Sequence, residues 1–181
     1  MDSIIRADLH RYYGLKGTRG FLRGWFVPGF RYTYFFRKAG SARRYSITGL
    51  FYKVMLRRYM FRFGFQIPIG TQIGSGFYIG HFGNVIINRD AVIGMNCNVS
   101  PGVTIGRVNR GKLEGCPVIG DYVWIGTNAV VVGKILIGSH VLIAPNSFVN
   151  FDVPDRSIVI GNPARIIPRE NPTEGYITDV L

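Results

Sequence analysis

The sequence lacks several features that would place it in a common class. No run of eighteen apolar residues occurs, so a transmembrane helix is not expected. Two cysteines, Cys97 and Cys116, are too few for a disulfide framework. The first residues include Asp2 and Asp8 and lack the basic start, apolar middle and cleavage site of a signal peptide. Together these absences favour a reducing cytoplasm as the compartment.

Acidic residues are scarce and unevenly spread. The chain has 22 Lys and Arg against 10 Asp and Glu, which gives a net charge of +12. The excess lies in residues 1–63, where 14 basic residues stand beside two acidic ones, whereas residues 64–181 have eight of each. Most of the aromatic residues also lie in the first part. The chain is therefore expected to have two parts, of which the first is basic and aromatic.

Residues 1–65 are expected to form a small, mostly helical segment. Between Ser46 and Phe65, apolar side chains recur near helical spacing with basic residues between them, which predicts an amphipathic basic helix. Before it we expect shorter helices and loops, because glycine and proline interrupt the pattern. The interruptions are Gly20, Gly24, Pro28 and Gly29.

This basic segment has three open interpretations. It could be a solvated helical face packed on the rest of the chain or on a neighbouring subunit. It could contact an anionic membrane at the inner face, where basic residues flank buried aromatics. Nucleic-acid binding would suit the charge but has no recognition motif here, and we expect no nucleic-acid partner.

From about residue 66 the sequence repeats every six residues. The leading aliphatic series is Ile69, Ile87, Ile93, Val99 and Ile105, followed by Ile119, Ile125, Val131, Ile137, Ile143 and Val149. This period belongs neither to a helix nor to a half-buried strand, and it is typical of a parallel β-helix in which each repeat supplies a short strand and a turn. In this count Ser75 and His81 stand where an aliphatic residue is due.

The repeat is interrupted once and is closed by a tail. The spacing between Ile105 and Ile119 is fourteen instead of twelve, and the polar segment 107–117 is expected to leave the prism as a loop. The expected fold is mainly β: about four coils over residues 66–155, preceded by the helical segment. The tail 156–181 leaves the repeat at Arg156 and is expected to cap the open β edge.

Few side chains are placed for chemistry. His10 and His140 have no recognisable context, whereas His81 could act as a general base, because an imidazole can take up a proton near neutral pH. A structural role for His81 is equally open. Cys116 and Glu114 lie in the loop, where a thiol and a carboxylate are commonly incidental. No phosphate-binding glycine loop and no metal-ligand spacing occur, so no metal is predicted.

Two motifs carry a resemblance to a known family. The hexapeptide run with Val123-Trp124-Ile125-Gly126, and the closing Gly161-Asn162-Pro163-Ala164-Arg165-Ile166-Ile167, resemble the left-handed β-helix acyltransferases over about residues 66–168. The left-handed sense is implied by this resemblance, since parallel crossovers are generally right-handed and the period does not fix the sense. Within the superfamily the chain looks most like serine O-acetyltransferases, especially relatives encoded with bacterial surface-polysaccharide genes.

The resemblance implies roles for particular residues. His81 would be the catalytic base. Because Gln66 replaces the aspartate that orients the histidine in the family, Glu114 or a backbone carbonyl is the candidate for that role here. Coenzyme A would lie between neighbouring prisms of a homotrimer. The implied coenzyme A contacts are Thr127, Ala144, Pro145 and Arg165. We assign Gln66, Asn84 and Cys116 to the acceptor side.

Three departures weigh against L-serine as the acceptor. Serine acetyltransferases have an aspartate where this chain has Gln66, and a second aspartate directly before the histidine, where this chain has Gly80. Their loop has an Arg-His pair before a proline, and here Gly115-Cys116 precede Pro117. The prediction is therefore an acetyl-CoA-dependent O-acetyltransferase acting on a sugar hydroxyl of a surface-polysaccharide precursor. Serine or sugar N-acetylation, and a non-catalytic trimeric scaffold, are the alternatives.

Overall fold

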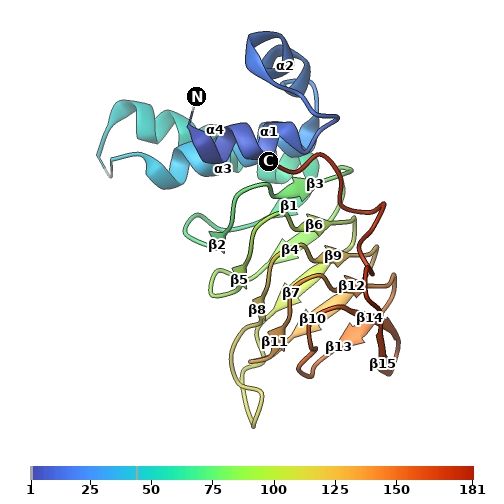
Figure 1. The fold of residues 1–181 in the computed structure, drawn as a ribbon. Helices are drawn as coiled ribbons and strands as arrows, with labels where there is room; N and C mark the ends of the chain where they lie inside the picture. Colours follow the sequence, from blue (N-terminus) through green and yellow to red (C-terminus); the bar gives the residue numbers. More distant parts are fainter. Residues whose placement is uncertain (1, 44) are drawn as a thin grey trace.

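In the described part of the chain, all the helices come before all the strands. The computed structural model describes residues 2–43 and 45–181, and within them it has four helices at one end of a three-sided prism of short strands (Figure 1). The helices are α1 (Ser3–His10), α2 (Gly17–Gly24), α3 (Pro28–Ser41) and α4 (Ile47–Phe63). Among the described residues, none of these helices is long and apolar enough to cross a bilayer.

The ends of α4 follow from local chemistry. The hydroxyl of Ser46 accepts a hydrogen bond from the backbone N–H of Gly49 at 3.0 Å, which caps the first turn. Gly64 ends the helix in the left-handed conformation, at φ 77°. A side chain at Gly64 would also crowd the carbonyl oxygen of Gly83. Glycine therefore lets the chain turn from helix into the first strand.

Parallel strands, most of them of two to three residues, wind the prism. Over the described residues they form three sheets, and one strand from each completes a coil. Sheet 1 contains β1 (Phe65–Gln66), β4 (Val85–Ile87), β7 (Thr104–Gly106), β10 (Val130–Val132) and β13 (Phe148–Val149). Sheet 2 contains β2 (Gln72–Ile73), β5 (Val92–Ile93), β8 (Val118–Ile119) and β11 (Leu136–Ile137). Sheet 3 contains β3 (Tyr78–Ile79), β6 (Asn98–Val99), β9 (Trp124–Ile125), β12 (Leu142–Ile143), β14 (Ser157–Gly161) and β15 (Ala164–Pro168). The predicted mainly β fold with a small helical segment is confirmed.

The core register differs from the predicted count in the first coil. Ile73 pairs with Ile93 and Ile79 pairs with Val99, so the inward column continues through Ile73 and Ile79. The count through Ile69, Ser75 and His81 is therefore wrong. The step from the inward residue Ile79 to the next, Val85, is six positions, where the same step in the later coils is four, because the turn between β3 and β4 is two residues longer. His81 lies in this longer turn and is exposed, not in the aliphatic column.

The spacing at the excursion loop also needs correction. Ile119 is the next inward residue after Ile105, so the spacing due is six, and the loop adds eight residues instead of two. The segment 107–117 is a small hairpin in which Val108 and Gly115 exchange two backbone hydrogen bonds of 3.0 Å. The backbone N–H of Lys134 donates to the carbonyl of Leu113 at 2.9 Å, which holds the loop against the next coil.

The tail continues the prism before it leaves it. Strand β14 pairs in parallel with β12, so the expectation that the repeat ends at Arg156 is wrong. Strand β15 then folds back antiparallel on β14 and covers that edge of sheet 3, as a cap requires. The last residues return along the prism toward α1 (Figure 1). On the way, the ring of Tyr176 contacts that of Trp124 in β9 at a centroid distance of 4.8 Å.

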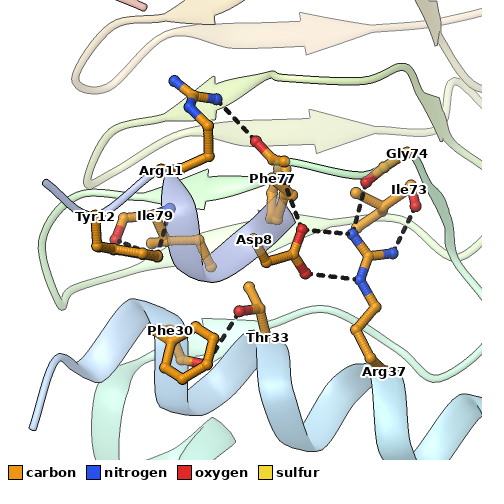
Figure 2. A network of polar contacts seen from close by, with 11 residues as sticks. Asp8, Arg11, Tyr12, Phe30, Thr33, Arg37, Ile73, Gly74, Phe77 and Ile79 are labelled. Atoms are coloured by element: carbon orange, nitrogen blue, oxygen red, sulfur yellow. Dashed lines mark hydrogen bonds and ion pairs between the residues drawn. The ribbon is translucent and has the colours of Figure 1, made fainter. Parts of the chain in front are cut away.

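Buried polar side chains of α1 and α3 close the opposite end of the prism (Figure 2). The Asp8 carboxylate pairs with Arg37 at 2.9 Å and accepts a hydrogen bond from the N–H of Phe77. Arg37 also donates to the carbonyls of Ile73 and Gly74. These carbonyls belong to the first coil and have no strand beyond them, so the arginine supplies the donors that a further coil would have given.

Two tyrosines complete the closure. The hydroxyl of Tyr12 donates to the carbonyl of Ile79 and accepts from its N–H, at 3.3 and 3.2 Å. Tyr32 makes the same pair of bonds with Ile67. Burial raises the pKa of both phenols, so both hydroxyls stay protonated and can donate. Each tyrosine thus bonds one residue as a neighbouring strand would.

Gly29 should be intolerant of even one added methyl group. A Cβ there would collide with the carbonyl oxygen of Ile79 and crowd the Tyr12 hydroxyl, because α3 begins directly against β3. Gly29→Ala should lower the free energy of unfolding by about 1–3 kcal/mol, measured by urea denaturation. Gly40→Ala, in the same helix but facing open space, should leave stability unchanged or raise it. Equal stability of the two variants would contradict this packing.

Candidate functional site

His81 lies at the corner of the prism where sheet 3 turns into sheet 1. We call this edge the 3–1 corner; between inward residues it contains the turns 80–84, 100–102, 126–128 and 144–146. His81 and Phe82 are both exposed on the first of these turns. A hydrogen bond to helix α4 holds this turn in place: the N–H of Gly83 donates to the carbonyl of Phe63, the last residue of α4, at 2.9 Å. The helical segment therefore positions the turn that carries the histidine.

Hydrogen bonds join the turns of this corner into one column. The N–H of Gly102 donates to Asn84, that of Asn128 to Pro101, and that of Asn146 to Thr127, each from a turn to the one before it. Three of the residues assigned to coenzyme A contacts, Thr127, Ala144 and Pro145, therefore lie on the same corner as His81. At about 4.8 Å per coil, the turn of His81 and that of Pro145 are roughly 14 Å apart.

A groove of about 610 Å³ runs beside the lower part of this corner. Its lining combines Ala144 and Pro145 of this corner with residues of the returning tail and with apolar residues of sheet 3: Trp124, Leu142, Ile158 and Ile160. The tail residues that line the groove are Arg169, Asn171, Pro172, Glu174 and Tyr176. An apolar lining with a cationic side chain can hold a long, flexible chain that ends in phosphates.

Arg165 stands at the last rung of sheet 3. It is exposed on β15 and pairs in register with Ile160, which lines the groove. Arg165 therefore lies beside a strand that lines the groove, although it is not itself one of the lining residues. A guanidinium can bind a phosphate through two parallel hydrogen bonds.

Two other predicted site residues lie on a different corner. Glu114 and Cys116 belong to the hairpin 107–117, between sheets 1 and 2. Arg107 reaches Asp90 at 3.2 Å and Glu114 at 3.8 Å, all exposed. The Cys116 thiol donates to the amide oxygen of Asn88 at 3.4 Å, and burial raises its pKa, which disfavours the reactive thiolate. Within the described residues, Glu114 is not hydrogen-bonded to His81.

The residues predicted to bind the acceptor also lie on two different corners of the prism. Gln66 is exposed on β1, two residues after the glycine that contacts the His81 turn, and Asn84 ends that turn. These two therefore gather at the His81 end of the 3–1 corner. Cys116 lies on the other corner, so a single chain does not assemble the whole predicted set.

The tail residues of the groove were missed from the sequence. Residues 169–181 have no six-residue period, and nothing in the sequence indicates that they return along sheet 3. Two bonds hold the returning chain: the Arg11 guanidinium donates to the carbonyl of Thr178, and the Asn98 amide donates to that of Tyr176. By contrast, the sequence did contain a signal for the longer His81 turn. Inward residues occur in pairs two positions apart, and successive pairs are normally six positions apart, but the pairs that end in Ile79 and Ile87 are eight apart.

Comparison with known proteins agrees with this architecture. Residues 116–150 match the family model described as bacterial transferase hexapeptide (six repeats). The serine acetyltransferase of Bacillus subtilis is 39% identical over 104 residues, which are 58% of this chain and 48% of that protein. The curated relatives are matched over 30% to 54% of their own length, so the chain spans about a third to a half of them.

Two solved structures share both the prism and the helical end. Soybean serine acetyltransferase, without ligand, has a TM-score of 0.76 and 30% identity, over 91% of this chain and 68% of that one. Serine acetyltransferase of Brucella abortus, in complex with coenzyme A, has a TM-score of 0.75 and 27% identity, over 92% and 67%. The likeness gives the prism the left-handed sense implied by the sequence resemblance. The chain therefore belongs to the hexapeptide-repeat acyltransferases and is a serine O-acetyltransferase-like member of that family.

Proposed function

We propose that this protein is an O-acetyltransferase that uses acetyl-CoA. The observation that carries the proposal is the 3–1 corner, on which His81 and the donor-side residues Thr127, Ala144 and Pro145 lie in one hydrogen-bonded column. The groove beside it has an apolar lining that suits the pantetheine arm of coenzyme A, and the cation Arg169 in that lining could meet a phosphate, whereas Glu174 also lines it. The relative from Brucella abortus was solved with coenzyme A, which supports the same donor.

The proposed reaction is direct transfer in a ternary complex. His81 accepts the proton of the acceptor hydroxyl while its oxygen attacks the thioester carbonyl, so a C–O bond forms and the C–S bond breaks. The proton then passes from the imidazole to the departing coenzyme A thiolate. Backbone N–H groups of the corner turns would stabilise the oxyanion, and holding both substrates on one corner would supply much of the rate.

Serine is the first acceptor to test. The related proteins named above are all serine acetyltransferases, and the comparisons give no support to the sugar acceptor expected from the sequence. A sugar hydroxyl stays as the second candidate on one observation. The exposed Gln66 and the half-buried Gly80 stand where the family resemblance implies aspartates, so the charge that would hold the amino group of serine is missing.

Release of free coenzyme A from acetyl-CoA tests the activity and the acceptor together. We expect turnover that depends on an acceptor, measured with serine, with amino sugars and with sugars that carry only hydroxyl groups. Turnover with serine alone would assign the serine reaction, and turnover with sugars alone would assign the second candidate. A chain that neither binds acetyl-CoA nor releases coenzyme A would be a non-catalytic scaffold.

We also propose that the site is completed by a neighbouring subunit of a homotrimer. The loop residues Glu114 and Cys116 and the base His81 lie on different corners of one prism, and only a second copy could bring such corners together. Light scattering coupled to size-exclusion chromatography should give three times the mass of the chain. A monomer with full activity would exclude a shared site.

Arg165 is expected to act on acetyl-CoA binding. Arg165→Gln keeps length and polarity but removes the charge opposite the phosphates, so the KM for acetyl-CoA should rise by about tenfold with little change in kcat. Arg19→Gln on helix α2 removes the same charge elsewhere and should leave both constants unchanged. An equal KM in the two variants would remove Arg165 from the donor site.

A further inference from the structure

Helix α4 has two apolar faces, and only one of them is buried. The inner face, with Leu56, Tyr59 and Phe63, packs into the core. The outer face carries five large apolar side chains that are each more than half exposed. We call them the outer stripe: Ile47 (88% exposed), Leu50 (63%), Phe51 (55%), Val54 (57%) and Phe61 (73%). At 100° per residue they fall within an arc of roughly 100°. Such a stripe on a protein surface indicates a site of interaction.

Cations lie beside the outer stripe, and one of them, Arg58, lies within its arc. Lys53, Arg57, Arg58 and Arg62 lie on α4, and the helix has no acidic residue. The Arg57 guanidinium lies 5.6 Å from the centre of the Phe61 ring, beside the stripe. In the ranges 2–43 and 45–181, the ion pairs do not include these four cations. The two acidic residues of the helical segment are already paired with α3, Asp2 with Lys38 and Asp8 with Arg37.

The outer stripe stands on a part of the molecule that projects. The hairpin of α3 and α4 extends sideways past the strands, and its tip reaches well beyond the prism (Figure 1). Helix α4 packs along α3 and meets the prism at β1, next to its last residues. Residues 47–54, which hold four of the five stripe residues, therefore lie on the projecting half. A flat surface could approach them without meeting the coils.

We infer that the outer stripe docks on an anionic bilayer surface. Apolar side chains would enter the boundary between headgroups and acyl chains, while the flanking cations would meet lipid phosphates. A two-fold contact between copies would place like charges of the same patch together, which opposes association. A nucleic-acid strand could use the cations, but the aliphatic side chains of the stripe cannot stack on bases. This inference does not depend on the acetyl transfer, so either can fail without the other.

Vesicle co-sedimentation of the full chain tests the inference. The probe is phosphatidylcholine with about 30 mol% phosphatidylglycerol, compared with phosphatidylcholine alone, at roughly 0.05 and 0.5 M salt. We expect binding to the anionic vesicles that weakens at high salt. Arg57→Gln/Arg58→Gln should weaken binding by roughly 25-fold, at about fivefold per cation. Leu50→Ser/Val54→Ser should weaken it by about tenfold or more at either salt.

Matched variants separate this surface from the general charge of the chain. Arg110→Gln/Lys112→Gln removes the same charge from the exposed loop, and Leu181→Ser removes an exposed apolar side chain at the C-terminus. Both should bind vesicles as the wild type does. No binding at low salt, or binding that both α4 variants retain, would overturn the inference. The inference would also be overturned if, without vesicles, light scattering gave the wild type a larger mass than Leu50→Ser/Val54→Ser. The stripe would then be a contact between copies of the chain.

Discussion

Replacing His81 with alanine should lower kcat for acetyl transfer by about 10²–10⁴-fold, the range that loss of a general base produces. His81 is exposed on a turn two residues longer than its counterparts, so the change removes no core contact and should leave the fold intact. Release of free coenzyme A measures the rate with the acceptor that the wild type uses. Thermal unfolding should give the same midpoint for both proteins.

His140→Ala is the matched control for this prediction. His140 is also an exposed turn histidine, but it lies on the corner between sheets 2 and 3 and stacks on Tyr122 at 4.8 Å. We expect its kcat to stay within about twofold of the wild type. If His81→Ala kept acceptor-dependent turnover, the protein would remain an acetyltransferase, but its base would be another group. A loss of acetyl-CoA binding in His81→Ala would instead assign the histidine to the donor site.

Arg37→Met should cost about 3–5 kcal/mol of stability, the range for breaking a buried ion pair. The Arg37 and Asp8 side chains are only 8% and 1% exposed. The substitution leaves the Asp8 carboxylate without its cation and the carbonyls of Ile73 and Gly74 without their donor. Chemical denaturation should show a lower midpoint. Lys38→Met is the matched control, because Lys38 pairs with Asp2 on the surface, where such a pair contributes about 0–1 kcal/mol.

The cost of Arg37→Met should depend on pH in a defined direction. Burial raises the pKa of Asp8, and Arg37 acts against that rise. Without Arg37 the pKa in the folded state lies further above the unfolded value, so the variant is least stable where the carboxylate is charged. Its deficit relative to the wild type should therefore shrink as the pH falls toward about 4. A deficit that stays constant from neutral to acidic pH would mean that the lost backbone bonds, not the buried charge, dominate.

The six-residue count failed to predict which residues point into the core before Ile87. From Ile87 onward the count places every leading aliphatic inward, and the columns Ile93–Ile119–Ile137 follow it. Before Ile87 the count is two residues out of phase, because it assumes turns of constant length. The error affected function as well as packing: it placed His81 among core positions, whereas the longer turn exposes it. The inner pairs Phe65 with Ile67 and Phe77 with Ile79 would have revealed the shift.

The sequence by itself determined the class of fold, the excursion loop, the basic helix α4 and the residues that the family resemblance singles out. These follow from local periodicity and composition, because each coil repeats the same strand and turn. Only the tertiary structure decided which corner each candidate occupies, that the tail returns along sheet 3 to line the groove, and that Asp8, Arg37, Tyr12 and Tyr32 close the first coil. Those contacts join residues far apart in the chain, and their side chains pair with backbone groups, which carry no sequence signal.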